Sequence, residues 1–164
     1  TADCRLWGGF ALIVFFFFMF LGGCAGSTSC GIKMFHIQVL FATASSQMQR
    51  LLRPHGVFVA HYNRRPIPTT VSNAVMSFFF LFLVTYVILT LALTALGLDF
   101  ITSLSSAAAA ITNVGPALGP TTGPAGTYVT LPDAAKWLLA AGMLLGRLEL
   151  LTVLVLLTPR FWRA

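Results

Sequence analysis

An uncharged apolar stretch from Thr70 to Leu98 constrains the fold of this chain more than any other feature. No Asp, Glu, Lys or Arg interrupts it, and Phe, Leu and Val dominate it. At about 1.5 Å per residue, a helix of this length crosses the roughly 30 Å hydrocarbon core of a bilayer. The chain has 9% charged and 57% hydrophobic residues, whereas a soluble domain carries about 25% charged residues. We therefore predict an all-α membrane protein.

The first apolar run ends in a polar, glycine-rich segment at membrane depth. The run from about Trp7 to Leu21 is followed by "GGCAGSTSCGIK", residues 22–33, and a second apolar piece begins at Ile32. A helix of about fifteen residues reaches roughly 22 Å, which is too short to cross the hydrocarbon core. The two pieces are therefore predicted to form one spanning element, residues 1–53, interrupted near its middle. Such non-helical backbone is tolerated only inside protein or along a watery cavity.

The connector that follows, residues 54–69, is basic and lacks acids. The positive-inside rule places such a segment in the cytoplasm, and we read the net charge of +6 as this signal rather than as a nucleic-acid-binding surface. The preceding helix is expected to end at Pro54, and a short hairpin is expected around 63–64. The two histidines, six residues apart, are interpreted as solvated. The basic and histidine side chains of residues 45–68, which include the end of the preceding helix, are Arg50, Arg53, His55, His61, Arg64 and Arg65.

Residues 70–164 are organised as helix, half-helix, Gly/Pro-rich stretch and helix. After the helix 70–98, the segment 99–111 is too short to span and too rich in Ala and Ser to face lipid, so we predict a re-entrant half-helix capped by Asp99. The glycines and prolines of 112–126 exclude regular structure, and a last helix is predicted over 132–158. This order is typical of the pore-loop unit of cation channels; the alternative is a plain outer loop between two helices.

In a pore loop, the residues after the half-helix would line the path of the ion. The partly negative C-terminal end of a half-helix entering from outside would favour a cation near the membrane centre. Gly115 has access to backbone angles closed to other residues, so successive carbonyls can face one axis. We therefore predict a selectivity filter that binds a hard monovalent cation through backbone carbonyls. Its residues are Thr112, Asn113, Val114, Gly115 and Pro116, with the cation at the first four.

Charged residues within the last helix are a second unusual feature. Arg147 and Glu149 lie two residues apart, and helical residues at that spacing do not face each other. A charge at membrane depth needs a partner or water, so Arg147 is expected to find acceptors on another element.

Several other functions are excluded by the residues. The spacing in "GSTSCGIK" suggests a phosphate-binding loop, but Ile32 stands where that motif needs Lys. No nucleophile–base pair or carboxylate pair is evident, so we expect neither an enzyme nor a bound cofactor. The cysteines, Cys4, Cys24 and Cys30, form no CxxC pair and are interpreted as small apolar fillers.

Three stretches, "GGCAGSTSCGIK", "ITNVGPALGP" and "LPDAAKWLLAAGMLLGRLELLTVLVLLTPRFW", resemble the C-terminal part of the Trk-type potassium uptake membrane subunits of the Trk/Ktr/HKT superfamily. The resemblance covers essentially the whole chain. It implies four helix–pore-loop–helix repeats around one pore, of which this chain would hold the inner helix of the third repeat and all of the fourth. It also implies K⁺ uptake, a bacterial inner-membrane location with several crossings, a homodimer, and a cytoplasmic nucleotide-binding regulatory subunit of the RCK type.

The resemblance assigns roles to particular residues. Residues 112–115 match the fourth filter strand, residues 22–33 match the intramembrane loop that gates the pore below the filter, and Arg147 matches the basic residue facing that loop. We take the glycines and hydroxyls as the movable part of the gate and Lys33 as a positive barrier. The gating residues are Gly22, Gly23, Gly26, Ser27, Thr28, Ser29, Gly31 and Lys33. Two departures from the family pattern are Cys30 and Ala117, where glycine is usual.

Two alternatives stay open at this point. Thr1 is not an initiator Met, so the chain is expected to be part of a longer one; a truncated, non-conducting membrane fragment is the first alternative. A sodium-coupled cation symporter of the same superfamily is the second. The two transport readings are not separable by sequence.

Overall fold

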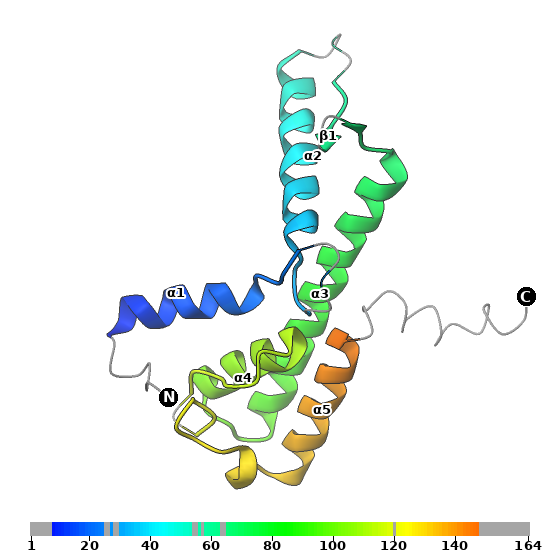
Figure 1. The fold of residues 1–164 in the computed structure, drawn as a ribbon. Helices are drawn as coiled ribbons and strands as arrows, with labels where there is room; N and C mark the ends of the chain where they lie inside the picture. The colour runs from blue at the N-terminus through cyan, green and yellow to red at the C-terminus, as the bar shows by residue number, and fades with distance from the viewer. Residues whose placement is uncertain are drawn as a thin grey trace, which may run out of the picture.

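A computed structural model describes residues 8–24, 27, 30–53, 56, 58–62, 65–119 and 121–147. Within these residues the fold is helical apart from one short hairpin, as predicted. Figure 1 shows α3 as the long central helix, with α2 and the hairpin at one end and α4 and α5 packed at the other. The elements are α1 (Gly9–Phe20), α2 (Met34–Leu52), β1 (His61–Tyr62), β2 (Arg65–Pro66), α3 (Thr69–Ala95), α4 (Phe100–Thr112), η2 (Tyr128–Thr130) and α5 (Asp133–Arg147).

Helix α3 is, among the described residues, the one helix long and apolar enough to cross a membrane. It has 27 residues and a mean hydropathy of 2.4, so it extends about 40 Å. The helix ends three residues before the predicted Leu98, because Gly97 adopts a φ of +86° and turns the chain toward Asp99. Asp99 occupies the N-cap position of α4, as predicted, but its side chain makes no capping hydrogen bond.

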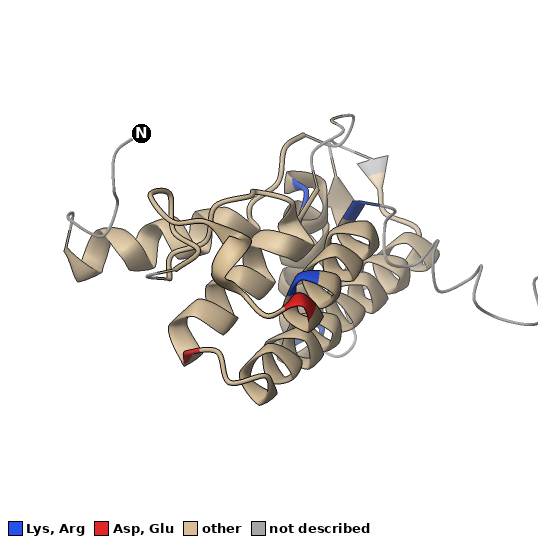
Figure 2. Cartoon of the chain, turned by 90° about the horizontal axis from the view of Figure 1, so that it is seen from below, with Lys and Arg blue, Asp and Glu red and all other residues tan. Residues whose placement is uncertain are grey.

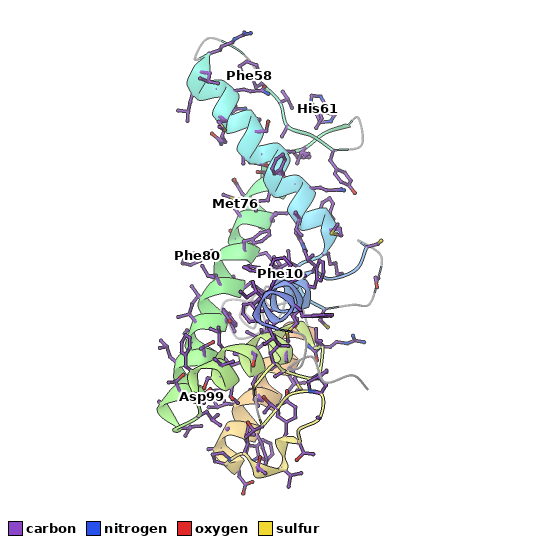
Figure 3. All side chains as sticks on the ribbon, turned by 90° about the vertical axis from the view of Figure 1, so that its left-hand side faces the viewer. Phe10, Phe58, His61, Met76, Phe80 and Asp99 are labelled. Atoms are coloured by element: carbon purple, nitrogen blue, oxygen red, sulfur yellow. The ribbon has the colours of Figure 1, made fainter. Side chains whose placement is uncertain are left out.

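The basic connector forms the predicted hairpin at the far end of α2 and α3. Strands β1 and β2 pair antiparallel, with His61 opposite Pro66 and Tyr62 opposite Arg65. Helix α2 ends at Leu52, and Arg50 near its end donates to the carbonyl oxygen of Phe58 at 2.8 Å. Figure 3 places Phe58 and His61 at the opposite end of the molecule from Asp99. This separation follows the predicted cytoplasmic and outer ends.

Helix α4 is enclosed by the rest of the described chain. Nearly all of its residues from Thr102 onward are buried, against α3, α5 and α1. The Ala- and Ser-rich sequence explains this, because small side chains let neighbouring backbones approach closely. On α5, a Cβ at Gly142 would meet Leu89 of α3, and a Cβ at Gly146 would run into the carbonyl of Ile111. The expectation that this half-helix avoids lipid is therefore confirmed in its packing.

The glycine-rich break after α1 also changes the direction of the chain. In Figures 1 and 3, α1 runs across the end of α4 and the side of α3, whereas α2 follows α3. Leu21 ends α1 in an extended conformation, and Gly31 turns the chain with a φ of +85° before Lys33 starts α2. The two helices are thus two arms of an angled element. The break lies where it was predicted, and the assignment of both helices to one spanning element stays a prediction.

The outer faces of α1 and α3 carry large, exposed apolar side chains. Phe10 is 82% exposed, Phe80 67% and Met76 51%, and Figure 3 shows all three projecting from their helices. Figure 2 shows few charged positions on these helices. The described acids, Asp99 and Asp133, flank the starts of α4 and α5. Such faces are typical of helices surrounded by lipid or by further protein.

Candidate functional site

The end of α4 is closed by a Schellman motif that begins the predicted filter. Asn113 adopts the left-handed conformation, with φ 55° and ψ 37°. Its N–H donates to Ala110 O at 3.2 Å, and the N–H of Val114 donates to Ala109 O at 3.1 Å. The helix therefore includes Thr112, one residue beyond the predicted end, because this motif satisfies the last turn.

Asn113 also ties the predicted filter to α5. Its side-chain Nδ2 donates to the carbonyl oxygen of Met143 at 3.1 Å, while the Thr112 hydroxyl bonds back to Ala108 within α4. The sequence contained a signal for the turn, since asparagine is among the few residues that tolerate the left-handed region. The bond to α5 had no such signal, because it joins residues 30 positions apart.

Gly115 has the unusual backbone that was predicted for it. Its φ is +102°, a region that disfavours residues with a Cβ. Its carbonyl oxygen accepts a hydrogen bond from the hydroxyl of Tyr128 at 2.7 Å. Neighbouring Val114 and Pro116 are exposed. Sequence reasoning missed Tyr128, because the bond depends on how the intervening loop folds.

The chain returning from the predicted filter is fixed at Ala117 and Thr122. Ala117 is buried, and its N–H donates to Thr122 O at 2.9 Å. The Thr122 hydroxyl pairs with that of Ser106 on α4 at 3.0 Å. Gly115 and Asn113, but not Ala117, are among the residues with positive φ. The methyl group at this departure from the family pattern is therefore accommodated without backbone strain.

The first break, residues 22–33 between α1 and α2, is closed by backbone bonds where its ends meet. Leu21 and Ile32 form a parallel bridge. The N–H of Gly22 donates to Ile32 O, and the N–H of Ile32 donates to Phe20 O, both at 3.0 Å. A Cβ at Gly22 would lie 2.6 Å from the carbonyl oxygen of Cys30, so this close approach requires glycine. These bonds replace the helical bonds lost at the break.

The first break and the second break, residues 113–127 between α4 and η2, meet at one small cavity. A Cβ built on Gly31 would lie 3.5 Å from the Thr112 methyl group, so the predicted gate faces the start of the predicted filter. The cavity beside this contact has a volume of about 250 Å³. It is lined by Met19, Leu21, Gly22, Gly23, Cys30, Thr112, Asn113, Val114 and Arg147. The structure thus brings together Gly22, Gly23, residues 112–114 and Arg147, which the sequence had placed in three separate roles.

Arg147 reaches the first break from the end of α5. Its Nη1 donates to the Sγ of Cys30 at 3.7 Å, so it does find a partner on another element. The interpretation of Cys30 as an apolar filler is wrong: the side chain is half-buried and faces a cation. Cys24 is exposed, which also excludes a filler role.

The remaining predicted gate residues are described in part. Ser27 lies in a bend with an exposed side chain, and Lys33 is the half-buried residue that precedes α2. Gly26, Thr28 and Ser29 lie outside the described residues, as do Cys4, His55 and the predicted last helix beyond Arg147.

The site offers backbone oxygens, the Cys30 thiol and the guanidinium of Arg147. Across the part of the chain that the structure describes, no three His, Cys, Asp or Glu residues are grouped to hold a metal ion. His61 is exposed and its Nδ1 lies 2.8 Å from Val59 O, as expected for a solvated histidine. Backbone carbonyl oxygens such as those of the second break can replace the hydration shell of a monovalent cation.

Comparison with known proteins gives this arrangement a family. Residues 1–163 match the model of the TrkH family, described as cation transport proteins. The chain is 53% identical over 161 residues to the Trk system potassium uptake protein TrkI of Halomonas elongata. It is 37% identical over 163 residues to TrkH of Escherichia coli K12. These alignments cover 98% and 99% of the chain, respectively, and 33% of each relative, so the chain spans about a third of their length.

A solved structure agrees with the fold. The chain superposes on the crystal structure of the potassium transporter TrkH from Vibrio parahaemolyticus with a TM-score of 0.88 and 37% identity, covering 98% of this chain and 34% of that one. These relatives are membrane transporters rather than enzymes, and the long apolar α3 fits a membrane protein. The chain therefore belongs to the TrkH family of cation transport proteins.

Proposed function

We propose that this chain is the C-terminal part of a potassium uptake transporter, in which residues 112–116 contribute one strand of a K⁺ filter and residues 22–33 form a gate below it. The observation that carries the proposal is that residues of both segments line one cavity, where Gly31 faces Thr112. A glycine-rich loop pressed against the carbonyl end of a buried half-helix is well placed to block an ion leaving that end. The uptake named for the relatives supports K⁺ as the ion.

The gate proposal gives Arg147 a physical role. Its guanidinium holds a positive charge beside the cavity between the two breaks, where it opposes the passage of a cation. Its contact with Cys30 fastens the loop in this position. Movement of the loop away from Thr112 would open the cavity and remove both obstacles at once.

The wider setting is part of the same proposal. We place the hairpin end in the cytoplasm of a bacterial cell and the turn around Asp99 outside its inner membrane, with several crossings. A homodimer and an RCK-type regulatory subunit at the cytoplasmic side complete the assembly, supported by the resemblance of the sequence to that family. In this assembly the regulatory nucleotide belongs to the partner subunit.

The filter assignment is tested by Gly115→Ser in the full-length parent protein, expressed in a strain that lacks K⁺ uptake. We expect the K⁺-over-Na⁺ preference of uptake, followed with Rb⁺ and Na⁺, to fall by about tenfold, because serine is strained at this φ. Gly97→Ser is the matched control: Gly97 also has a positive φ, +86°, but lies at the outer turn of α3 with open space around it. Unchanged selectivity in Gly115→Ser contradicts the filter assignment.

A second measurement separates a transporter segment from an independent channel. One complete pore-loop repeat cannot surround an ion, so the 164-residue chain alone is expected to pass no K⁺ current in planar bilayers. A K⁺-selective current from the isolated chain would contradict the proposed position of this segment within a larger pore.

A further inference from the structure

Tyr128 makes a bond to the predicted filter that the pore-loop pattern does not explain. It lies in η2, the short turn that leads from the second break into α5. Its hydroxyl donates to the carbonyl oxygen of Gly115 at 2.7 Å, the usual distance for such a bond. The two residues are 13 positions apart, so the bond closes the loop that follows the filter.

The ring of Tyr128 is anchored independently of this bond. It packs against the buried cluster formed by α3, α4 and α5, which includes Leu131, Ala135 and Leu139. The hydroxyl is therefore presented to Gly115 from a fixed support. Burial raises the pKa of the Tyr128 hydroxyl above its ordinary value, so it stays protonated and remains a donor at neutral pH.

Gly115 needs such a donor to hold one orientation. A Cβ built on it would meet nothing within 4 Å, so no neighbouring atom packs against that side of its Cα. Glycine also has more backbone freedom than any other residue. A carbonyl oxygen has two lone pairs, so the bond to Tyr128 fixes its direction and leaves a second lone pair for an ion.

We propose that Tyr128 is a positioning residue for ion selectivity, whose hydroxyl holds the Gly115 carbonyl at the outer end of the filter. The inference rests on the proposed function of residues 112–116. Discrimination between K⁺ and the smaller Na⁺ depends on the number and placement of carbonyl ligands. Loss of the hydroxyl frees the Gly115 carbonyl to turn, which removes a ligand and weakens the preference for K⁺.

The test is Tyr128→Phe in the full-length parent, which removes one oxygen and keeps the ring. We expect the K⁺-over-Na⁺ preference of Rb⁺ and Na⁺ uptake to fall by about three- to tenfold, the range that corresponds to one hydrogen bond. Tyr86→Phe is the matched control, because its hydroxyl donates to Leu104 O at 3.2 Å in the middle of α4. That variant should leave the selectivity ratio unchanged at equal amounts of protein in the membrane.

The outcomes are distinguishable. Lower uptake of both ions with an unchanged ratio shows a structural role and overturns the inference. A ratio changed by Gly115→Ser but not by Tyr128→Phe overturns the role of Tyr128 and leaves the filter assignment standing, whereas a ratio unchanged in both overturns the filter itself. If the Tyr128→Phe protein does not accumulate in the membrane, Tyr128→Met is the alternative, because methionine fills the same apolar site without a hydroxyl. We expect the same fall in the K⁺-over-Na⁺ preference for that variant.

Discussion

The two breaks in this chain are both rich in glycine, yet they are held in different ways. The break after α4 is fixed by side chains along its length: Asn113 binds α5, Thr122 binds α4, and Tyr128 holds Gly115 from the packed core. The break after α1 is closed by backbone bonds where its two ends meet, at Leu21 and Ile32. From α5, Arg147 adds a 3.7 Å contact with the Cys30 sulfur.

This difference matches two mechanical demands. A filter must keep its carbonyl groups at fixed positions, because small displacements change which ion fits. A gate must have two arrangements that differ little in free energy. Under the proposed function, the two breaks differ in role although they share a glycine-rich composition, and their surrounding contacts distinguish them.

The packing of α5 against the filter end of α4 should be the most sensitive point. In Gly146→Ala the new methyl group collides with the carbonyl of Ile111 and crowds the Asn113 amide. Overpacking of this kind costs about 1–3 kcal/mol, and we expect Rb⁺ uptake by the full-length protein to fall by about tenfold or more. Gly142→Ala on the same helix meets the flexible end of Leu89 and should retain most uptake. Equal uptake in the two variants would argue against this packing.

Substitutions at Asn113 test whether the break after α4 depends on the left-handed turn or on the side-chain hydrogen bond to Met143. Asn113→Gly keeps the left-handed turn and removes the bond to Met143, whereas Asn113→Ala removes both. We expect the alanine variant to be less stable by about 1–2 kcal/mol than the glycine variant, because left-handed backbone is costly for alanine. Thermal unfolding of the purified full-length protein measures this difference. A glycine variant as unstable as the alanine variant would assign the effect to the side chain alone.

Local features of the fold were predictable because their causes are local. The length of α3 follows from an uncharged apolar run, the pairing of β1 with β2 follows from alternation, and the positive φ of Gly115 follows from residue type. The burial of α4 was also predictable, since a half-helix of Ala and Ser has little apolar surface for lipid.

The remaining features depend on contacts between distant residues. Arg147 and Cys30 are 117 positions apart, and Ser106 and Thr122 meet because the loop between them folds back. The direction of α1 depends on ring packing such as Phe20 against Tyr86, at 5.5 Å between centroids. Residue type alone carries no signal for such pairings, so Cys30 was misread as a filler and Tyr128 was overlooked.

The break after α1, which we propose as the gate, should respond to loss of its contact with α5. Arg147→Ala removes the contact with Cys30 and a positive charge beside the cavity, so we expect a several-fold increase in open probability of the full-length protein. Arg147→Lys keeps the charge and loses the planar donor group, so it separates electrostatic from bonding effects. Cys30→Gly should act in the same direction with a smaller effect. An open probability unchanged in Arg147→Ala would remove this residue from the gate.

The smallest expected effect on transport concerns the hydroxyl pair of Ser106 and Thr122, which braces the break after α4. In Thr122→Val the buried Ser106 hydroxyl loses its partner, which costs about 1–3 kcal/mol of stability. The double variant Ser106→Ala/Thr122→Val leaves no unpaired hydroxyl at this contact and should recover most of that loss in thermal unfolding. If both variants keep the wild-type K⁺-over-Na⁺ preference, the brace stabilises the loop without setting ion choice. A change in that preference would instead extend the selectivity determinants from Tyr128 and Gly115 to the returning chain, and the contrast between the two breaks would then rest on a larger fixed region.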